Sequence, residues 1–226
     1  MSLTRTQFED QLDKLRHRLL EMGSAADNMV GLAMQALTEQ NVDLAEKVIA
    51  NDDVIDAMDI EIETECMRLI ALQAPVARDL HLLGTAVKAI TDLERIGDHA
   101  VDIAKVARKL SYETFFQPLV DLPRMAAAVR QMLREVMAAF VDHDLDLVKK
   151  VVDADDEVDT FYHQIRDELH AVMRKDPSLV VQASYLLFVA HYLERIADHT
   201  VNIAERVHYA ETGKLVQLAK SHTPTS

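Results

Sequence analysis

A twelve-residue stretch that occurs twice limits the fold of this 226-residue chain more than any other feature. The first copy, LERIGDHAVDIA, covers residues 93–104, and the second, LERIADHTVNIA, covers residues 193–204. Upstream, residues 34–56 resemble residues 137–159 at an offset of 103, so the first copy carries three extra residues, which we place near Pro75. An internal duplication of this length predicts two similar structural units.

Apolar residues recur at spacings of three and four in both copies, which is the pattern of amphipathic helices. Five helices are expected at residues 8–37, 43–72, 76–112, 125–140 and 147–172, and a sixth follows Asp176-Pro177 and fades near Tyr209. Only five glycines and five prolines interrupt these patterns, and no strand pattern competes.

The expected fold is therefore all-α, with two tandem three-helix bundles made of six long antiparallel helices. The first repeat is expected at residues 1–116 and the second at 117–226, with a frayed tail from about residue 211. Asp121 is expected to cap the fourth helix, because Pro123 would then occupy its first turn.

Charge and cysteine content restrict the partners and the compartment. The net charge of −14 disfavours nucleic acid and anionic membranes and suits cations or basic proteins. Cys66 is the only cysteine, so no disulfide can form within the chain, and its place on an apolar face indicates a core residue. No apolar run of membrane-spanning length and no signal peptide are apparent, so a cytoplasmic protein is expected.

Two acids in each copy of the repeat fall where core side chains are expected. On a helical wheel, Glu94 and Asp98 share the face of Leu80, Leu83 and Ile90, and the second copy repeats this arrangement. A buried carboxylate without a partner costs several kcal/mol or becomes neutral. These acids therefore need a cation or a polar seam between helices.

The second helix of each repeat adds an Asp-x-x-x-Asp motif, so four carboxylates would converge if the two helices pack side by side. Oxygen-rich sites suit Mg²⁺, Ca²⁺ or Mn²⁺, and carboxylate-bridged iron or zinc is also compatible. The candidate metal ligands are Asp52, Asp56, Glu94, Asp98 and Asp102 in the first repeat and Asp155, Asp159, Glu194 and Asp198 in the second. Because Asn202 replaces the fifth acid, the second site would carry less charge.

Two other interpretations remain open. Arg or Lys from another helix would neutralise the acids in a metal-free scaffold, and a carboxylate-bridged di-metal enzyme is the second alternative. Such enzymes use Glu-x-x-His motifs with inward histidines, whereas His99 and His199 fall away from the carboxylates, as do Arg95 and Arg195. No nucleophile motif, phosphate-binding loop or His-Glu-x-x-His is present, so catalysis is not expected.

The chain resembles the PhoU family of phosphate-signalling regulators. The resemblance rests on the two copies of Leu-Glu-Arg-Ile-(Gly/Ala)-Asp-His-(Ala/Thr)-Val-(Asp/Asn)-Ile-Ala, each preceded by an acidic motif, and it extends from Phe8 to Tyr209. Ala197, where the motif usually has Gly, and Asp102, where Asn is common, depart from it.

The resemblance implies a cytosolic homodimer with metal sites, of iron, zinc or another divalent metal, at the acidic motifs. It also implies contacts with the ATPase of the phosphate ABC transporter and with a sensor histidine kinase. The implied role is negative regulation, in which phosphate uptake and phosphate-starvation genes are kept low while phosphate is abundant.

Overall fold

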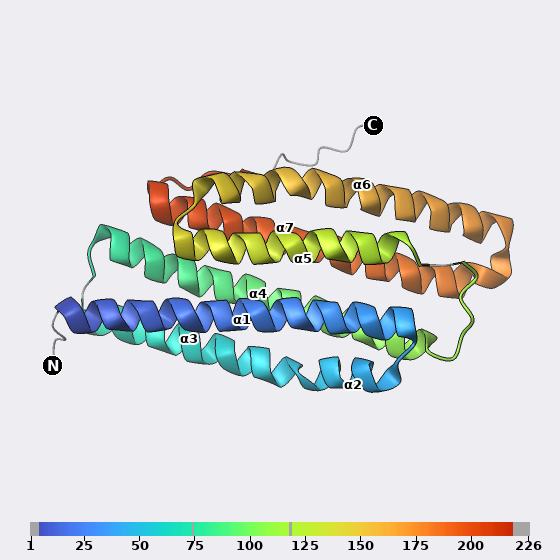
Figure 1. The fold of residues 1–226 in the computed structure, drawn as a ribbon, viewed down its shortest axis with the longest axis horizontal. Coiled ribbons are helices and arrows are strands. Elements are labelled where there is room, and N and C mark those ends of the chain that lie inside the picture. The colour runs from blue at the N-terminus through green and yellow to red at the C-terminus, as the bar shows by residue number, and fades with distance from the viewer. Residues whose placement is uncertain (1–4, 74, 118, 219–226) are drawn as a thin grey trace.

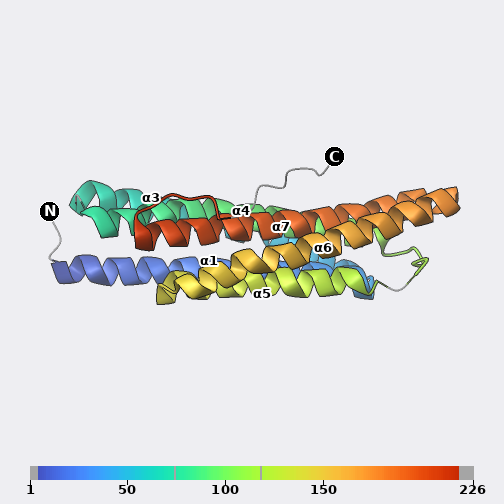
Figure 2. The ribbon, with the colours of Figure 1, turned by 90° about the horizontal axis from the view of Figure 1, so that it is seen from above.

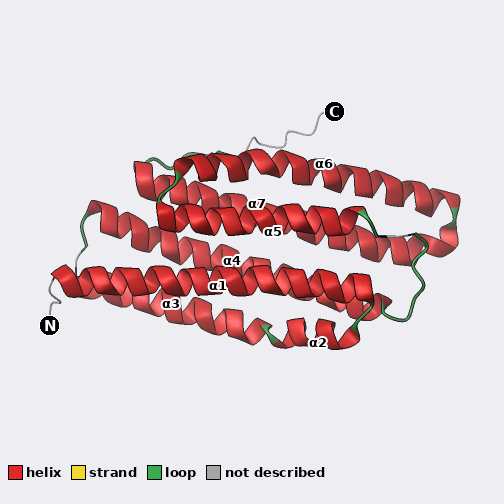
Figure 3. Cartoon of the chain, in the orientation of Figure 1, coloured by secondary structure: helices red, strands yellow, loops and turns green. Residues whose placement is uncertain are grey.

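A computed structural model describes residues 5–73, 75–117 and 119–218 of the chain. These residues form seven α-helices and one short 3-10 helix and contain no strand (Figure 3). The elements are α1 (Arg5–Glu39), α2 (Val42–Ala50), α3 (Asp52–Gln73), α4 (Ala77–Leu110), α5 (Asp121–Asp142), α6 (Leu145–Lys175), η1 (Pro177–Leu179) and α7 (Val180–Thr212). The all-α fold predicted from the sequence is confirmed.

The two repeats lie side by side along their length (Figure 1). Helices α1 to α4 form the first bundle and α5 to α7 the second, with α2 and α3 at one outer edge and α6 at the other. Among the described helices, those that meet across the boundary between the bundles are equivalent ones: α1 contacts α5 and α4 contacts α7 (Figure 2). Both pairs run antiparallel, and buried side chains of the two bundles form one continuous core.

The second expected helix is divided at Asn51 into α2 and α3. The Asn51 N–H bonds to the carbonyl oxygens of Lys47 and Val48 and closes α2, and Asp52 then starts a new helix, where acids are favourable. The equivalent position in the second repeat is Ala154, and α6 continues through it without a break. Alanine favours a helix interior and asparagine does not, which explains the difference between the repeats.

Helices α1 and α5 end at equivalent residues in the left-handed region. Gln40 has φ = 53° and His143 has φ = 57°. The Gln40 side chain donates a hydrogen bond to the Leu110 carbonyl oxygen at 2.9 Å, and His143 Nδ1 lies 2.5 Å from Glu211 Oε1. Each strained residue is therefore held by the last helix of its own repeat.

The predicted cap of α5 is wrong. Val120 occupies the N-cap position without a side-chain hydrogen bond, and Asp121 is the first helical residue. A carboxylate there still favours the helix because the exposed N–H groups of the first turn carry a partial positive charge.

Cys66 lies in the core, as its place on an apolar face predicted. It is completely buried, and burial raises the pKa of its thiol to about 12. At the other end of the chain, Gly213 caps α7 with φ = 68° and residues 213–218 are irregular. The remainder of the predicted tail, 219–226, lies outside the described residues. None of the helices in the described ranges combines the length and apolarity needed to cross a membrane.

Candidate functional site

The acidic motifs of the first repeat lie along the contact between α3 and α4. Burial raises the pKa of Asp52 on α3, and the negative charges of Asp56 and Asp98 raise it further, whereas Lys105 opposes the change. Since Asp98 belongs to α4, the carboxylates of the two helices are close enough to repel each other. This part of the predicted acidic set is brought together by the fold.

Glu94, on α4, is also affected by neighbouring carboxylates. Burial raises its pKa, and Asp98, Asp56 and Asp59 add to the rise, against the opposing charge of Arg95. Asp59 was not among the predicted ligands, although its position three residues after Asp56 was the available signal. The pKa of Asp59 is itself raised by burial and by neighbouring acids.

Glu94 and Asp98 lie at the edge of the core rather than on its central face. Their side chains are 24% and 36% exposed, while their neighbours Leu93 and Gly97 are buried. The predicted core-facing position is therefore wrong. Leu80, which helped to define the apolar face, is 44% exposed, because α4 contacts α1, α2, α3 and α7 along different parts of its surface.

Cations from the same helix neutralise these carboxylates. Arg95 Nη1 donates to Asp98 Oδ2 at 2.7 Å, and Arg95 Nε lies 3.3 Å from Glu94 Oε2. Lys105 donates to Asp102 at 3.0 Å. Arg95 therefore folds toward the acids, contrary to its predicted position, and the partners come from α4 itself rather than from another helix.

The donor chemistry of this set fits a hard cation, but the side-chain arrangement does not yet form a coordination sphere. Carboxylate oxygens are the preferred ligands of such ions. Within residues 5–73, 75–117 and 119–218, no group of three or more His, Cys, Asp or Glu side chains is arranged to hold a metal ion. Metal binding at the nine predicted acids remains a prediction.

The second acidic set has the same ion pair and one additional partner. Arg195 donates to Asp198 at 2.7 Å, and His191 Nδ1 lies 3.1 Å from Glu194 Oε2. Burial raises the pKa of Glu194, Asp198 adds to the rise, and His191 and Arg195 oppose it. The sequence interpretation missed His191, whose three-residue spacing from Glu194 was the signal, and its equivalent in the first repeat is Thr91.

The predicted ligands of α6 are Asp155, which is buried, and Asp159, which is half-buried. They lie on the helix that packs along α7, as the sequence required. In the part of the chain that the structure describes, they do not form a metal-binding group with the acids of α7.

A histidine pair marks the contact between the two repeats. The ring of His99 on α4 lies 5.7 Å from those of Tyr192 and His199 on α7. His199 Nδ1 lies 2.9 Å from Asp92 Oδ1, which also accepts a hydrogen bond from Asn202 at 3.2 Å. Asn202, the neutral counterpart of Asp102, thus joins the repeats.

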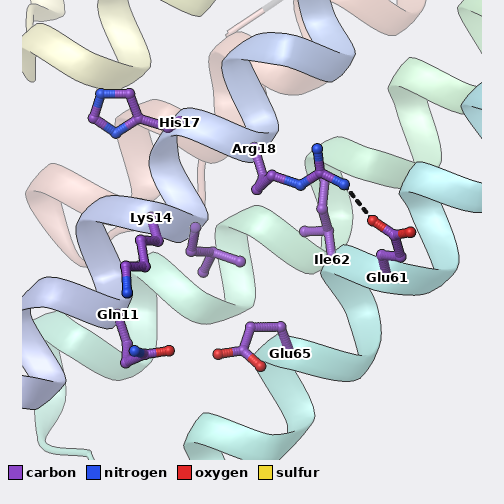
Figure 4. Close-up of a pocket in the computed structure, with 8 residues that line it drawn as sticks. Gln11, Lys14, His17, Arg18, Glu61, Ile62 and Glu65 are labelled. Carbon is purple, nitrogen blue, oxygen red and sulfur yellow. Dashed lines mark hydrogen bonds and ion pairs between the residues drawn. The ribbon is translucent and has the colours of Figure 1, made fainter.

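A cavity of about 650 Å³ lies apart from the acidic motifs, between α1 and α3 (Figure 4). The buried residues Leu15 and Ile62 line it, and Arg18 of α1 donates to the Glu61 carboxylate of α3. The remaining lining residues are Gln11, Lys14, His17 and Glu65. Sequence periodicity did not indicate this cavity, because its two walls come from helices about 45 residues apart.

Comparison with known proteins gives matches over both repeats. The PhoU domain matches residues 19–107 and again residues 122–207. A phosphate-specific transport system accessory protein PhoU homolog of Clostridium acetobutylicum is 44% identical, over 96% of this chain and 99% of its own length. The equally named protein of Aquifex aeolicus is 39% identical, over 92% and 94%.

Solved structures agree with this relationship. The crystal structure of PhoU from Pseudomonas aeruginosa has a TM-score of 0.88 at 35% identity, and it covers 92% of this chain and 100% of that one. The phosphate transport system regulatory protein PhoU from Streptococcus pneumoniae has a TM-score of 0.87 at 30% identity, over 92% and 99%. With both repeats matched and the whole helical arrangement shared, the chain belongs to the PhoU family.

Proposed function

We propose that this protein is a regulatory accessory protein of a phosphate-specific transport system and that it acts without catalysis. The observation that carries the proposal is the similarity, over nearly the full length, to relatives that are named as accessory or regulatory proteins of that system. In this role the protein, as a cytoplasmic homodimer, links the ATPase of the phosphate ABC transporter to a sensor histidine kinase. It restrains phosphate uptake and phosphate-starvation gene expression when phosphate is abundant.

Deletion of the gene tests this role. We expect phosphate-starvation genes to be expressed in high phosphate in the deletion strain and to be repressed again when the wild-type gene is restored. Expression that stays low in high phosphate after deletion would contradict the proposal.

We further propose that the acids of the first repeat bind a divalent or iron-type cation. The support is the gathering of carboxylates at the contact between α3 and α4. Burial raises the pKa values of Asp52 and Glu94, and repulsion by neighbouring carboxylates of both helices, which a bound cation would relieve, raises them further. When bound, the ion would supply positive charge between the two helices. The ligands would be drawn from the first-repeat acids, with Arg95 released from Asp98.

The second acidic set is expected to bind the cation more weakly. Asn202 replaces Asp102 there, and Glu194 already has His191 Nδ1 as a partner at 3.1 Å. Two variants separate the sites, Glu94→Gln/Asp98→Asn in the first repeat and Glu194→Gln/Asp198→Asn in the second.

Elemental mass spectrometry of protein purified without chelator or affinity tag measures the bound metal. We expect stoichiometric metal in the wild type, loss of most of it in the first-repeat variant, and a smaller loss in the second. If all three proteins contain equally little metal while the variants differ in stability, the acids are a polar seam of a metal-free scaffold. Redox or O₂ chemistry by iron-loaded protein would instead favour the di-metal enzyme.

A further inference from the structure

The outward face of α3 carries an apolar stripe that no part of the described chain covers. The stripe consists of Ala57, Ile60, Thr64, Met67 and Ala71, all of which are exposed, and it is named the α3 stripe below. Ile60 is 64% exposed and Met67 is 49% exposed. The spacings of three, four, three and four are those of the contact positions of a helix that packs against another helix.

The α3 stripe is distinct from the face that α3 buries in its own bundle. The buried residues Ile55, Ile62 and Leu69 are spaced by seven and lie on the opposite side of the helix. That buried face packs against α1 and α4, and Figure 1 shows α3 at the outer edge of the first bundle. α3 thus has a buried face and an exposed apolar stripe, and the described residues cover only the buried face.

The second repeat lacks an equivalent apolar stripe. The positions that correspond to the α3 stripe, at the offset of 103, are Thr160, His163, Asp167, His170 and Arg174 on α6. The two repeats share an origin and a fold, so packing of the bundle does not require apolar residues at these positions. The stripe is therefore a feature of the first repeat that the bundle itself does not explain.

Charges beside the stripe restrict what can cover it. On the side toward α4, Asp56 and Glu63 border the stripe, and neither has an ion-pair partner among the described residues. On the side toward α1, Glu61 and Glu65 are paired with Arg18 and Arg68. One border is therefore neutralised and the other carries uncompensated negative charge.

We propose that the α3 stripe is the docking site for a helix of a partner protein that has its own apolar stripe flanked by Lys or Arg. Apolar contacts would bury Ile60 and Met67, and the basic border of the partner would lie against Glu63, and against Asp56 in molecules where Asp56 is not a ligand of the proposed cation. A second copy of this chain fits less well, because two α3 helices would bring their acidic borders together. The proposal builds on the regulatory role, which requires protein partners.

A fluorescein-labelled peptide tests the site on the full-length protein. The probe is a 21-residue peptide of Leu and Lys, with Leu at the a and d positions of three heptads, and the control peptide has the same composition in scrambled order. Fluorescence anisotropy measures both affinities. We expect the heptad peptide to bind on the order of tenfold more tightly than the scrambled one.

The variant Ile60→Glu/Met67→Glu removes the apolar contacts but adds two negative charges. Docking on the stripe predicts that the variant binds the heptad peptide on the order of tenfold more weakly, whereas simple attraction of a basic peptide to an acidic protein predicts tighter binding. Unchanged or tighter binding would overturn the proposal. The matched control is Val181→Glu, which replaces a side chain of similar exposure, 61%, on α7.

Three more measurements complete the test. Thr64→Glu, at the centre of the stripe, should weaken binding of the heptad peptide as well, and circular dichroism checks that each variant is folded. Sedimentation of the protein without peptide tests whether a second copy of the chain covers the α3 stripe. A wild-type dimer that Ile60→Glu/Met67→Glu abolishes would overturn the proposal and assign the stripe to a second copy. Because these experiments use purified protein, their failure leaves the phosphate-dependent expression test unaffected.

Discussion

The His99 side chain lies at the contact between the repeats, and its pKa depends on that contact. Its Nδ1 is buried and has no hydrogen-bond partner in the described part of the chain. Burial lowers the pKa of His99 to about 4, with a further decrease from His199 and Arg195 that Asp102 and Asp98 oppose. His99 is therefore neutral at pH 7, and protonation works against the packing of α4 on α7.

The pH dependence of stability follows from this pKa. Unfolded His99 takes up a proton near pH 6.5 and the folded side chain only near pH 4, so the free energy of unfolding falls as the pH drops through this window. At 1.36 kcal/mol per pKa unit the upper limit is about 3 kcal/mol, and partial solvent access reduces our expectation to about 1 kcal/mol between pH 7 and pH 5.

Urea denaturation of His99→Gln at both pH values measures the effect. Between pH 7 and pH 5, the free energy of unfolding of the wild type should fall by about 1 kcal/mol more than that of the variant. His17→Gln, at an exposed position on α1, is the control and should behave as the wild type. Equal losses in wild type and His99→Gln would contradict the assignment.

At the scale of elements, Gly97 lets α4 approach α3 closely. A Cβ at this position would lie 3.3 Å from Cγ2 of Ile55, which is tighter than ordinary contact. The second repeat has Ala197 and Val158 at the equivalent positions, so one methyl group is gained on α7 and one is lost on α6. This exchange keeps the combined side-chain volume of the two positions constant.

A double-mutant cycle tests this contact. Ile55→Ala removes the Cγ2 atom that a Cβ at position 97 would meet. Ile55→Ala and Gly97→Ala should each affect stability, but together they should be more stable than the sum of the single effects by about 1 kcal/mol. The control cycle replaces Ile55→Ala by Ile62→Ala, which lies further along α3 and should be additive with Gly97→Ala. Gly84→Ala, where a Cβ meets no atom within 4 Å, measures the gain in helix propensity alone. An additive Ile55/Gly97 cycle would show that the two positions are independent.

At the scale of the whole molecule, the repeats pack about an approximate two-fold axis. His99 meets its own equivalent His199, and the contact of His99 with Tyr192 is matched by that of His199 with Asp92. Such reciprocal contacts are characteristic of a two-fold interface. The chain thus resembles a symmetric dimer whose two halves have been joined.

Asp27 and Arg130 are equivalent residues that pair across this axis on the α1–α5 side. Arg130 donates to both carboxylate oxygens of Asp27, at 2.8 and 2.9 Å, and Arg134 adds a third donor at 3.2 Å. The Asp27 side chain is only 15% exposed. One position is acidic and its duplicate is basic, so the two can form an ion pair between the repeats. Identical residues at these positions could not.

Removal of the Asp27 charge should loosen the pairing of the repeats. We expect Asp27→Asn to lower the free energy of unfolding by about 2 kcal/mol, since it leaves the half-buried guanidinium group of Arg130 without its carboxylate. Chemical denaturation monitored by circular dichroism gives this value. Asp13→Asn breaks an exposed pair with Arg16 and should change stability by less than about 0.5 kcal/mol. A similar small change for Asp27→Asn would mean that the pair contributes little.

The sequence alone determined the all-α fold, its duplication and the core position of Cys66. A long helix can be recognised from the spacing of its apolar residues, and a duplication from the sequence identity of its two copies. Neither requires knowledge of which helices are in contact. Even the break at Asn51 was accessible, since Asn51-Asp52-Asp53 is a poor helix interior. The nine predicted acids were likewise found from spacing, and their role in metal binding stays a prediction.

Only the tertiary structure decided where the side chains at the edges of these helices point. Periodicity places Glu94 on a broad apolar arc, but α4 packs against helices on several sides, and its neighbours decide which part of that arc remains open to solvent and to Arg95. The α3 stripe has the same origin, because a helix with two apolar faces does not reveal from its own spacing which one the bundle covers. Helical period is a local property, whereas burial depends on the neighbours that the folded chain brings from elsewhere.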